Sequence, residues 1–125
     1  VDARIPDNDG DQPVDVPSVP GAATAHFATL PVKEIARRIA DAGIPAEVSY
    51  SAGTFVCNHV FFTALEAAAS GTRAGFVHVP WSTEHAPTTE SAALPLSDIA
   101  RALEIAVRTS LDVAEDAAAS GGTLH

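Results

Sequence analysis

Two side chains in this sequence have the chemistry of a cysteine hydrolase. Cys57 is the only cysteine of the chain, and it lies where an extended segment is predicted to turn into a helix. His78 follows at the end of a second predicted buried strand. A thiol becomes a nucleophile when a base takes its proton, and an imidazole at a strand end is suited to that role. The spacing therefore indicates a Cys–His pair that acts on carbonyl groups.

The same two residues also have a purely structural interpretation. Most lone cysteines are small buried hydrophobes, and a histidine on an apolar strand packs in a core once its ring nitrogens are paired. The histidines share no metal-ligand spacing, and a zinc site would lack a second thiol. We therefore expect no metal and no cofactor.

Composition restricts the partners and the location of the protein. The 125 residues, 46% of them hydrophobic, are enough for one domain with a core. The formal net charge of −9, with only 7 Lys and Arg, argues against nucleic acid and against an anionic membrane. No apolar run approaches the ~18–20 residues of a membrane-spanning helix. One cysteine cannot form an internal disulfide, which fits a reducing compartment.

The pattern of apolar residues predicts helices alternating with strands. A helix begins at Thr29 or Leu30, with Pro31 in its first turn, and ends before Gly43. A strand is expected over 46–50 and a second over 74–79. Between them a helix runs from an N-cap at Thr54 to about Ala69 and is apolar nearly all round, so it should be buried.

The remaining segments are a loop over 81–95 and a final helix that begins at Ser97 or Asp98. The inner face of that helix is predicted to consist of Ile99, Leu103, Ala106, Val107, Ser110 and Ala114. Residues 1–21 form an irregular loop, and 120–125 should be a frayed tail. The order of elements is typical of parallel-sheet crossovers and predicts the α/β class.

The predicted N-cap would make Cys57 the third residue of its helix. N–H groups of a first helical turn lack partners within the helix, so they can stabilise a thiolate and hold the oxyanion of a tetrahedral intermediate. Gly53 would let a substrate carbonyl approach the backbone. Arg4 is the only cation of an acidic loop, which makes it a candidate for a role near the site.

Five blocks of the sequence resemble the pyrrolidone-carboxylate peptidase (pyroglutamyl peptidase I) family in order and approximate spacing. These blocks are DARIPDN at 2–8, TLPV at 29–32, GIPA at 43–46, SAGTFVCNH at 51–59 and GFVHVP at 75–80. They cover nearly the whole chain to about Glu84. The cysteine and histidine blocks together are the most specific.

The resemblance implies a cytosolic cysteine peptidase with a three-layer α/β/α fold around a mostly parallel, twisted sheet. Its substrates would be peptides with an N-terminal pyroglutamate, and the family implies a homo-oligomer, often a tetramer. Cys57 matches the nucleophile and His78 the catalytic histidine. Arg4 matches an arginine near the active site. The residues that match apolar positions of the pyroglutamyl pocket are Ile5, Phe55 and Val56.

The sequence departs from the family pattern in ways that affect the expected activity. The catalytic glutamate of the family would precede Val1, as would part of the pocket, so residues 1–125 are expected to be the C-terminal portion of a single domain and inactive alone. His26 stands where an aromatic is usual, and WSTEH at 81–85 replaces the usual Tyr-x-Pro-Glu-Gln. An orienting carboxylate fixes the tautomer of a catalytic imidazole, so a chain without it is expected to lack the activity.

Three functions therefore remain open at the level of sequence. The first is the C-terminal part of a pyroglutamyl peptidase. The second is a catalytically incomplete remnant that serves as an interaction or oligomer subunit. The third is another amidase that uses the same Cys57–His78 pair.

Overall fold

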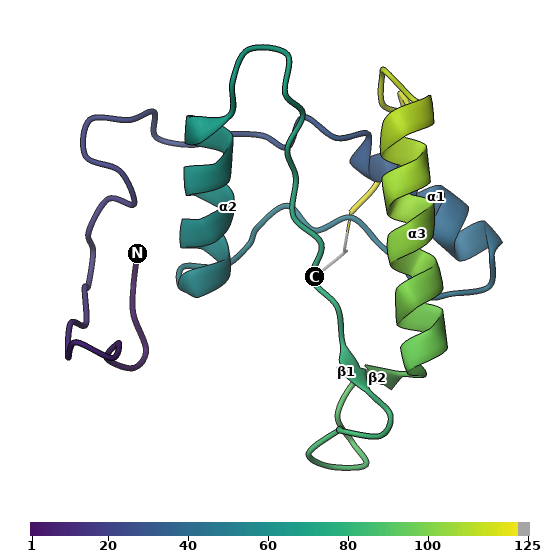
Figure 1. Cartoon of the computed structure of the whole chain (residues 1–125), viewed down its shortest axis with the longest axis horizontal. Helices are drawn as coiled ribbons and strands as arrows, with labels where there is room; N and C mark the ends of the chain where they lie inside the picture. Colours follow the sequence, from purple (N-terminus) through teal and green to yellow (C-terminus); the bar gives the residue numbers. More distant parts are fainter. Residues whose placement is uncertain (123–125) are drawn as a thin grey trace. The chain divides into compact units, whose positions relative to one another are not determined.

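The computed structural model describes residues 1–122 as two compact units (Figure 1). The first unit consists of residues 1–30 and 49–76, and the second of residues 31–48 and those from Val77 onward. The tail predicted for 120–125 lies partly outside the described residues. No helix in the described part of the chain is long and apolar enough to cross a membrane.

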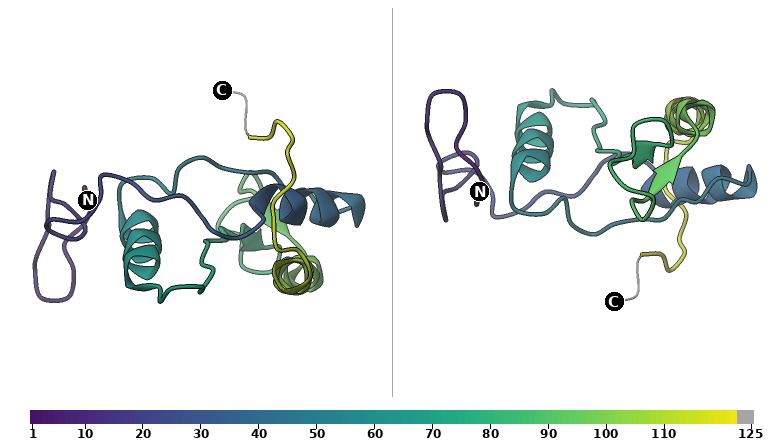
Figure 2. Two further views of the ribbon diagram at one scale, coloured as in Figure 1. Left: turned by 90° about the horizontal axis from the view of Figure 1, so that it is seen from above. Right: turned by 90° about the horizontal axis from the view of Figure 1, so that it is seen from below.

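The second unit is built on two helices that pack against each other, α1 (Val32–Asp41) and α3 (Leu96–Asp112). Ile35 and Ile39 recur one helical turn apart and are buried on α1, as the apolar spacing predicted. Ile99 and Ala106 are buried on α3. Figure 2 shows the two helices crossing each other, so the contact is confined to one stripe of each. This stripe contains most of the buried apolar residues of the described chain.

The inner face predicted for α3 is only partly correct. Ile99 and Ala106 are buried, but Leu103 is 39% and Val107 60% exposed. Thr109 is instead the most buried side chain, at 1% exposure. The apolar residues of α3 extend over a wider arc than the ten-residue α1 can cover, so part of that arc faces outward.

The start of α1 is capped by a residue far along the chain. Pro31 occupies the N-cap position and supplies no side-chain hydrogen bond. Asp116 fills this role, because its Oδ1 accepts hydrogen bonds from the backbone N–H groups of Lys33 and Glu34 at 3.1 and 3.0 Å. Two N–H groups that the helix leaves without an internal partner are thereby satisfied.

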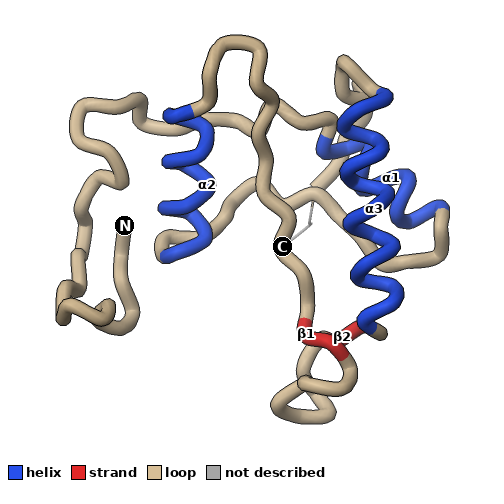
Figure 3. Tube along the Cα trace, viewed as in Figure 1, coloured by secondary structure: helices blue, strands red, loops and turns tan. Residues whose placement is uncertain are grey.

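The predicted strands over 46–50 and 74–79 are not formed, because neither segment has a ladder partner in the described chain. A strand-like pattern of residues is not sufficient, because a strand also requires a hydrogen-bonded neighbour. The strands observed are β1 (Trp81–Ser82) and β2 (Ala93–Leu94), inside the predicted loop (Figure 3). They pair in parallel, Trp81 opposite Ala93. Helices with a small parallel sheet agree with the α/β class.

The first unit contains the irregular loop of residues 1–21 and helix α2 (Val56–Ala67). Two ring contacts attach neighbouring segments to α2. His26 packs on Phe62 at a centroid distance of 4.8 Å and contacts Glu66 through Nε2 at 2.6 Å, while Phe76 packs on Phe61 at 5.9 Å. These contacts cover α2 only in part, and no residue of the helix is buried. The prediction of a buried helix was wrong.

We predict that Asp116→Ala lowers the free energy of unfolding by about 1 kcal/mol, the usual effect of losing a helix cap. Partial burial alone would raise the pKa of the Asp116 carboxyl, but hydrogen bonds from the N–H groups of Glu34, Lys33 and Ala117 lower it below its ordinary value. A lowered folded-state pKa stabilises the protein above the unfolded pKa and loses that effect as pH falls through the folded value. In urea unfolding, the difference between variant and parent should be seen at neutral pH and should shrink as pH falls below the ordinary aspartate pKa of about 4.

Asp116→Asn is the matched control, because its amide oxygen can accept the same hydrogen bonds. It should retain most of the parent's stability at neutral pH. An Asp116→Ala variant as stable as the parent would contradict the capping role.

Candidate active site

The candidate nucleophile lies in the first turn of α2. The helix begins at Val56, so Cys57 is its second residue, and the side chain is half-buried. N–H groups of a first turn point out of the helix end, where they favour negative charge and can hold an oxyanion. The local geometry therefore suits a thiolate nucleophile.

The predicted N-cap at Thr54 was wrong by one residue. Phe55 is the N-cap, with no side-chain hydrogen bond, so Cys57 is the second and not the third helical residue. Gly53 has φ +79°, a conformation that glycine adopts without strain. The backbone carbonyl of Thr54 accepts a hydrogen bond from the loop, which holds this residue outside the helix.

The structure places the predicted pocket residues and Cys57 in the same unit. The backbone N–H of Asp2 donates to the Thr54 carbonyl at 2.7 Å, which joins the segment that carries Arg4 and Ile5 to the start of α2. Arg4 is exposed, Ile5 is 65% exposed and Val56 is 55% exposed, while Phe55 is half-buried. Apolar side chains this exposed are available to contact a ligand.

The candidate base lies in the second unit. His78 is exposed and belongs to the extended segment before β1. The expectation that it ends a buried strand was wrong, because residues 74–80 form no ladder among the described residues. The core interpretation of His78 is not supported by its exposure. Its pairing with Cys57 stays a prediction.

The sequence did not reveal the residues that close the base of the irregular loop at 1–21. Asp2 and Asp15 form a backbone-to-side-chain hydrogen bond across the base of the loop, from the Asp15 N–H to the Asp2 Oδ1 at 2.9 Å. Asp15 has φ +54°, the only positive φ at a residue other than glycine in the described chain. The sequence carries one weak signal for this pairing, since aspartate tolerates this conformation better than most residues.

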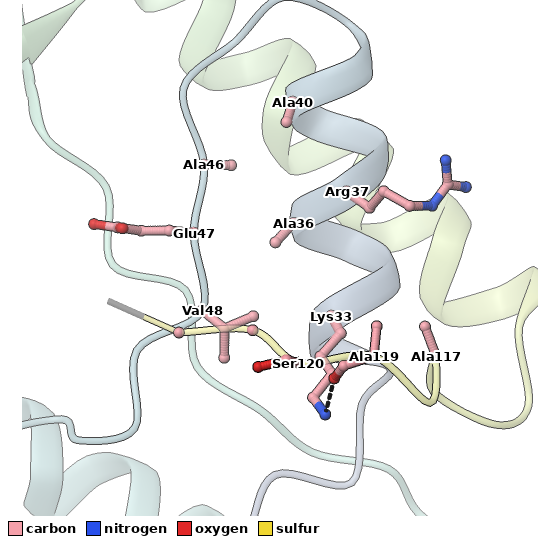
Figure 4. Close-up of a pocket in the computed structure, with 12 residues that line it drawn as sticks. Lys33, Ala36, Arg37, Ala40, Ala46, Glu47, Val48, Ala117, Ala119 and Ser120 are labelled. Atoms are coloured by element: carbon pink, nitrogen blue, oxygen red, sulfur yellow. Dashed lines mark hydrogen bonds between the residues drawn. The ribbon is translucent and has the colours of Figure 1, made fainter. Parts of the chain in front are cut away.

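A cavity of about 260 Å³ lies in the second unit (Figure 4). One wall is α1, and the others are the segments at 46–48 and 117–122. The Nζ of Lys33 donates to the Ala119 carbonyl at 2.6 Å on one side of it. None of the predicted site residues lines this cavity, so it does not bear on the Cys57 chemistry.

The model of the pyroglutamyl peptidase family matches residues 1–113. The chain belongs to this family. It is 46% identical over 127 residues to the pyrrolidone-carboxylate peptidase of Escherichia fergusonii and 48% identical over 125 residues to that of Chromobacterium violaceum. Each alignment includes 99% of this chain and 59% of the relative.

Solved structures of the pyroglutamyl peptidase family agree with the fold. The pyroglutamyl peptidase I of Bacillus amyloliquefaciens matches 94% of this chain with a TM-score of 0.86 at 40% identity. The pyrrolidone carboxyl peptidase of Thermococcus litoralis matches 90% with a TM-score of 0.83 at 41% identity. This chain covers 58% and 55% of those two chains. The similarity confirms the predicted α/β class and the predicted family.

We predict that Cys57 reacts faster with iodoacetamide in the folded chain than in the urea-unfolded chain at pH 6–7. The reason is that Cys57 lies in the first turn of a helix, a position typical of nucleophilic thiols. Mass spectrometry of the alkylated peptide gives both rates. Equal rates in the two states would favour a structural role for this cysteine.

Proposed function

We propose that the protein carrying this chain is a cysteine peptidase that removes the N-terminal pyroglutamyl residue from peptides. The observation that carries the proposal is the position of Cys57 in the first turn of α2, hydrogen-bonded through Asp2 and Thr54 to the segment with Arg4 and Ile5. Membership of the pyroglutamyl peptidase family supports it. Because the chain spans 59% of the length of the two curated relatives, the activity is proposed for the whole protein.

In the proposed reaction, His78 takes the proton of the Cys57 thiol, and the thiolate attacks the carbonyl carbon between the pyroglutamyl residue and the next one. The first-turn N–H groups of α2 stabilise the oxyanion. His78 then gives the proton to the leaving amine, and the peptide departs. Water, deprotonated by His78, hydrolyses the pyroglutamyl thioester and restores the thiol.

The remaining parts of the proposed site follow from the resemblance to the family. Ile5, Phe55 and Val56 contact the lactam ring, which is small and largely apolar, and Arg4 lies near the active site. A glutamate from the portion of the relatives that this chain does not cover orients His78. The proposed setting is the cytoplasm, where a lone thiol stays reduced. A homo-oligomer is proposed as its assembly.

A second candidate is a catalytically incomplete subunit that serves for interaction or oligomer formation. The observation that favours it is the amount of exposed apolar surface on α2, where Val56 and Val60 are 55% and 50% exposed and no residue is buried. Thiol reactivity and turnover distinguish this candidate from an enzyme. Another Cys–His amidase would be active but would not prefer pyroglutamyl substrates.

We predict that the 125-residue chain alone does not cleave a pyroglutamyl-coumarin substrate. The chain extended upstream to the length of its relatives should cleave it, because the orienting carboxylate and the rest of the lactam pocket are then present. Fluorimetry on the two purified proteins at equal concentration measures the rate at which each releases coumarin. Robust turnover by the 125-residue chain would contradict the proposed triad, and no turnover by the extended protein would contradict the peptidase assignment.

We predict that His78→Ala in the extended protein lowers kcat by about 10²–10⁴-fold, the range for loss of a general acid–base. The thermal midpoint should change little, because the side chain is exposed. His85→Ala is the matched control, since the one hydrogen bond of this exposed imidazole within the described chain joins its Nδ1 to the neighbouring Ser82 hydroxyl at 2.8 Å. Full activity of His78→Ala would remove His78 from the mechanism.

A further inference from the structure

Asp2 connects two parts of the first unit through different atoms. Its backbone N–H donates to the Thr54 carbonyl at 2.7 Å, immediately before the N-cap of α2. Its Oδ1 accepts from the Asp15 N–H at 2.9 Å on the far side of the loop. Asp2 is therefore bonded to the lead-in of the nucleophile helix and to the opposite end of the loop at the same time.

The base of the loop has further cross-links beside Asp2. The N–H of Ala3 donates to the Pro13 carbonyl at 2.8 Å, and Nε2 of Gln12 donates to the Ala3 carbonyl at 3.0 Å. Asp15, whose N–H donates to the Asp2 carboxylate, has the left-handed φ of +54°. Left-handed backbone at a residue with a side chain persists when surrounding bonds hold it.

The tip of the loop is ordered by its own hydrogen bonds. Oδ1 of Asp7 accepts from the N–H groups of Asp9 and Asp11, both at 2.9 Å. Arg4 and Ile5 lie between this tip and the cross-linked base. Their placement therefore depends on how the base is fastened to the start of α2.

We propose that Asp2 is a positioning residue for the pyroglutamyl site, acting through Arg4 and Ile5. The inference rests on the proposed function for the identity of the substrate. The Asp2 carboxylate helps to hold the base of the loop closed, together with the backbone bonds between Val1 and Val16 and between Ala3 and Pro13. The Asp2 N–H joins that base to the helix that carries Cys57. Asp2 itself makes no contact with the substrate in this proposal.

The side chain and the backbone of Asp2 can be separated by mutation. Asp2→Ala removes the acceptor for the Asp15 N–H but keeps the backbone bond to Thr54. Asp2→Asn keeps an acceptor oxygen without the charge. Asp9→Ala is the matched control, because it removes a carboxylate from the same loop whose oxygens make no hydrogen bond among the described residues.

The test uses the protein extended to the length of its relatives and a pyroglutamyl-coumarin substrate. Asp2→Ala should lower kcat/KM about tenfold, mainly by raising KM, the size expected for the loss of one hydrogen bond to a charged acceptor. Asp2→Asn should recover most of that loss, and Asp9→Ala should match the parent. The alkylation rate of Cys57 should be the same in all four proteins. Far-UV circular dichroism checks that each is folded.

Amide hydrogen exchange gives a second readout that does not depend on activity. The Asp15 and Ala3 amides, which donate to Asp2 and to Pro13, should exchange faster in Asp2→Ala than in the parent, and Asp2→Asn should restore their protection. An unchanged KM in Asp2→Ala, or no recovery in Asp2→Asn, would overturn the positioning role. If the parent cleaves no pyroglutamyl substrate, the proposed function fails, and the exchange rates decide the inference alone: faster exchange supports it and unchanged exchange overturns it.

Discussion

The hydrogen bond between the Asp2 N–H and the Thr54 carbonyl is the contact on which the geometry of the candidate site depends. It joins two segments that are far apart in sequence, the acidic loop at 1–16 and the start of α2. It holds the segment that carries Arg4 and Ile5 beside the start of the helix that carries Cys57. Because both partners are backbone groups, the sequence of the loop can vary while the connection stays.

The second unit depends on a different kind of contact. Ile35 and Ile39 of α1 and Ile99 and Ala106 of α3 are buried where the two helices pack, and they make up most of the apolar core of this unit. Glu34 adds local order on the outer side of α1, since its carboxylate accepts hydrogen bonds from Arg37 and Arg38, which lower its pKa to about 2. Ion pairs between residues three or four apart on one helix contribute little to stability. Packing between α1 and α3 therefore matters most for this unit.

Properties that depend on local sequence were the ones that could be predicted. The helical periodicity of residues 32–41 and the stop at Gly43 follow from short-range patterns, and the structure has α1 ending at Asp41. The family followed from the blocks around Cys57 and His78. The sequence of residues 74–79 could not show whether they form a strand, because a strand also requires a neighbour to pair with. The exposure of α2 likewise depends on which segments cover it.

The start of α2 shows how a tertiary contact can shift a helix boundary by one residue. The side chain of Thr54 favours the N-cap position. Its carbonyl, however, accepts a hydrogen bond from the Asp2 N–H, and α2 begins one residue later than the sequence predicts. The Asp2–Asp15 bond was not predictable for a similar reason, since it depends on an unusual backbone conformation at Asp15. Tertiary contacts with the loop decided both features.

The cap on α1 also has a consequence for the order of events during folding. Lys33 and Asp116 are separated by 83 positions, so a ribosome completes α1 long before it releases the carboxylate that satisfies the first turn. Until then water must solvate those N–H groups, and the helix ends remain open to fraying. Closing so long a loop costs entropy that a nearby cap would not. The N-terminal end of α1 is therefore expected to become fully ordered late, after α3 has emerged and packed against it.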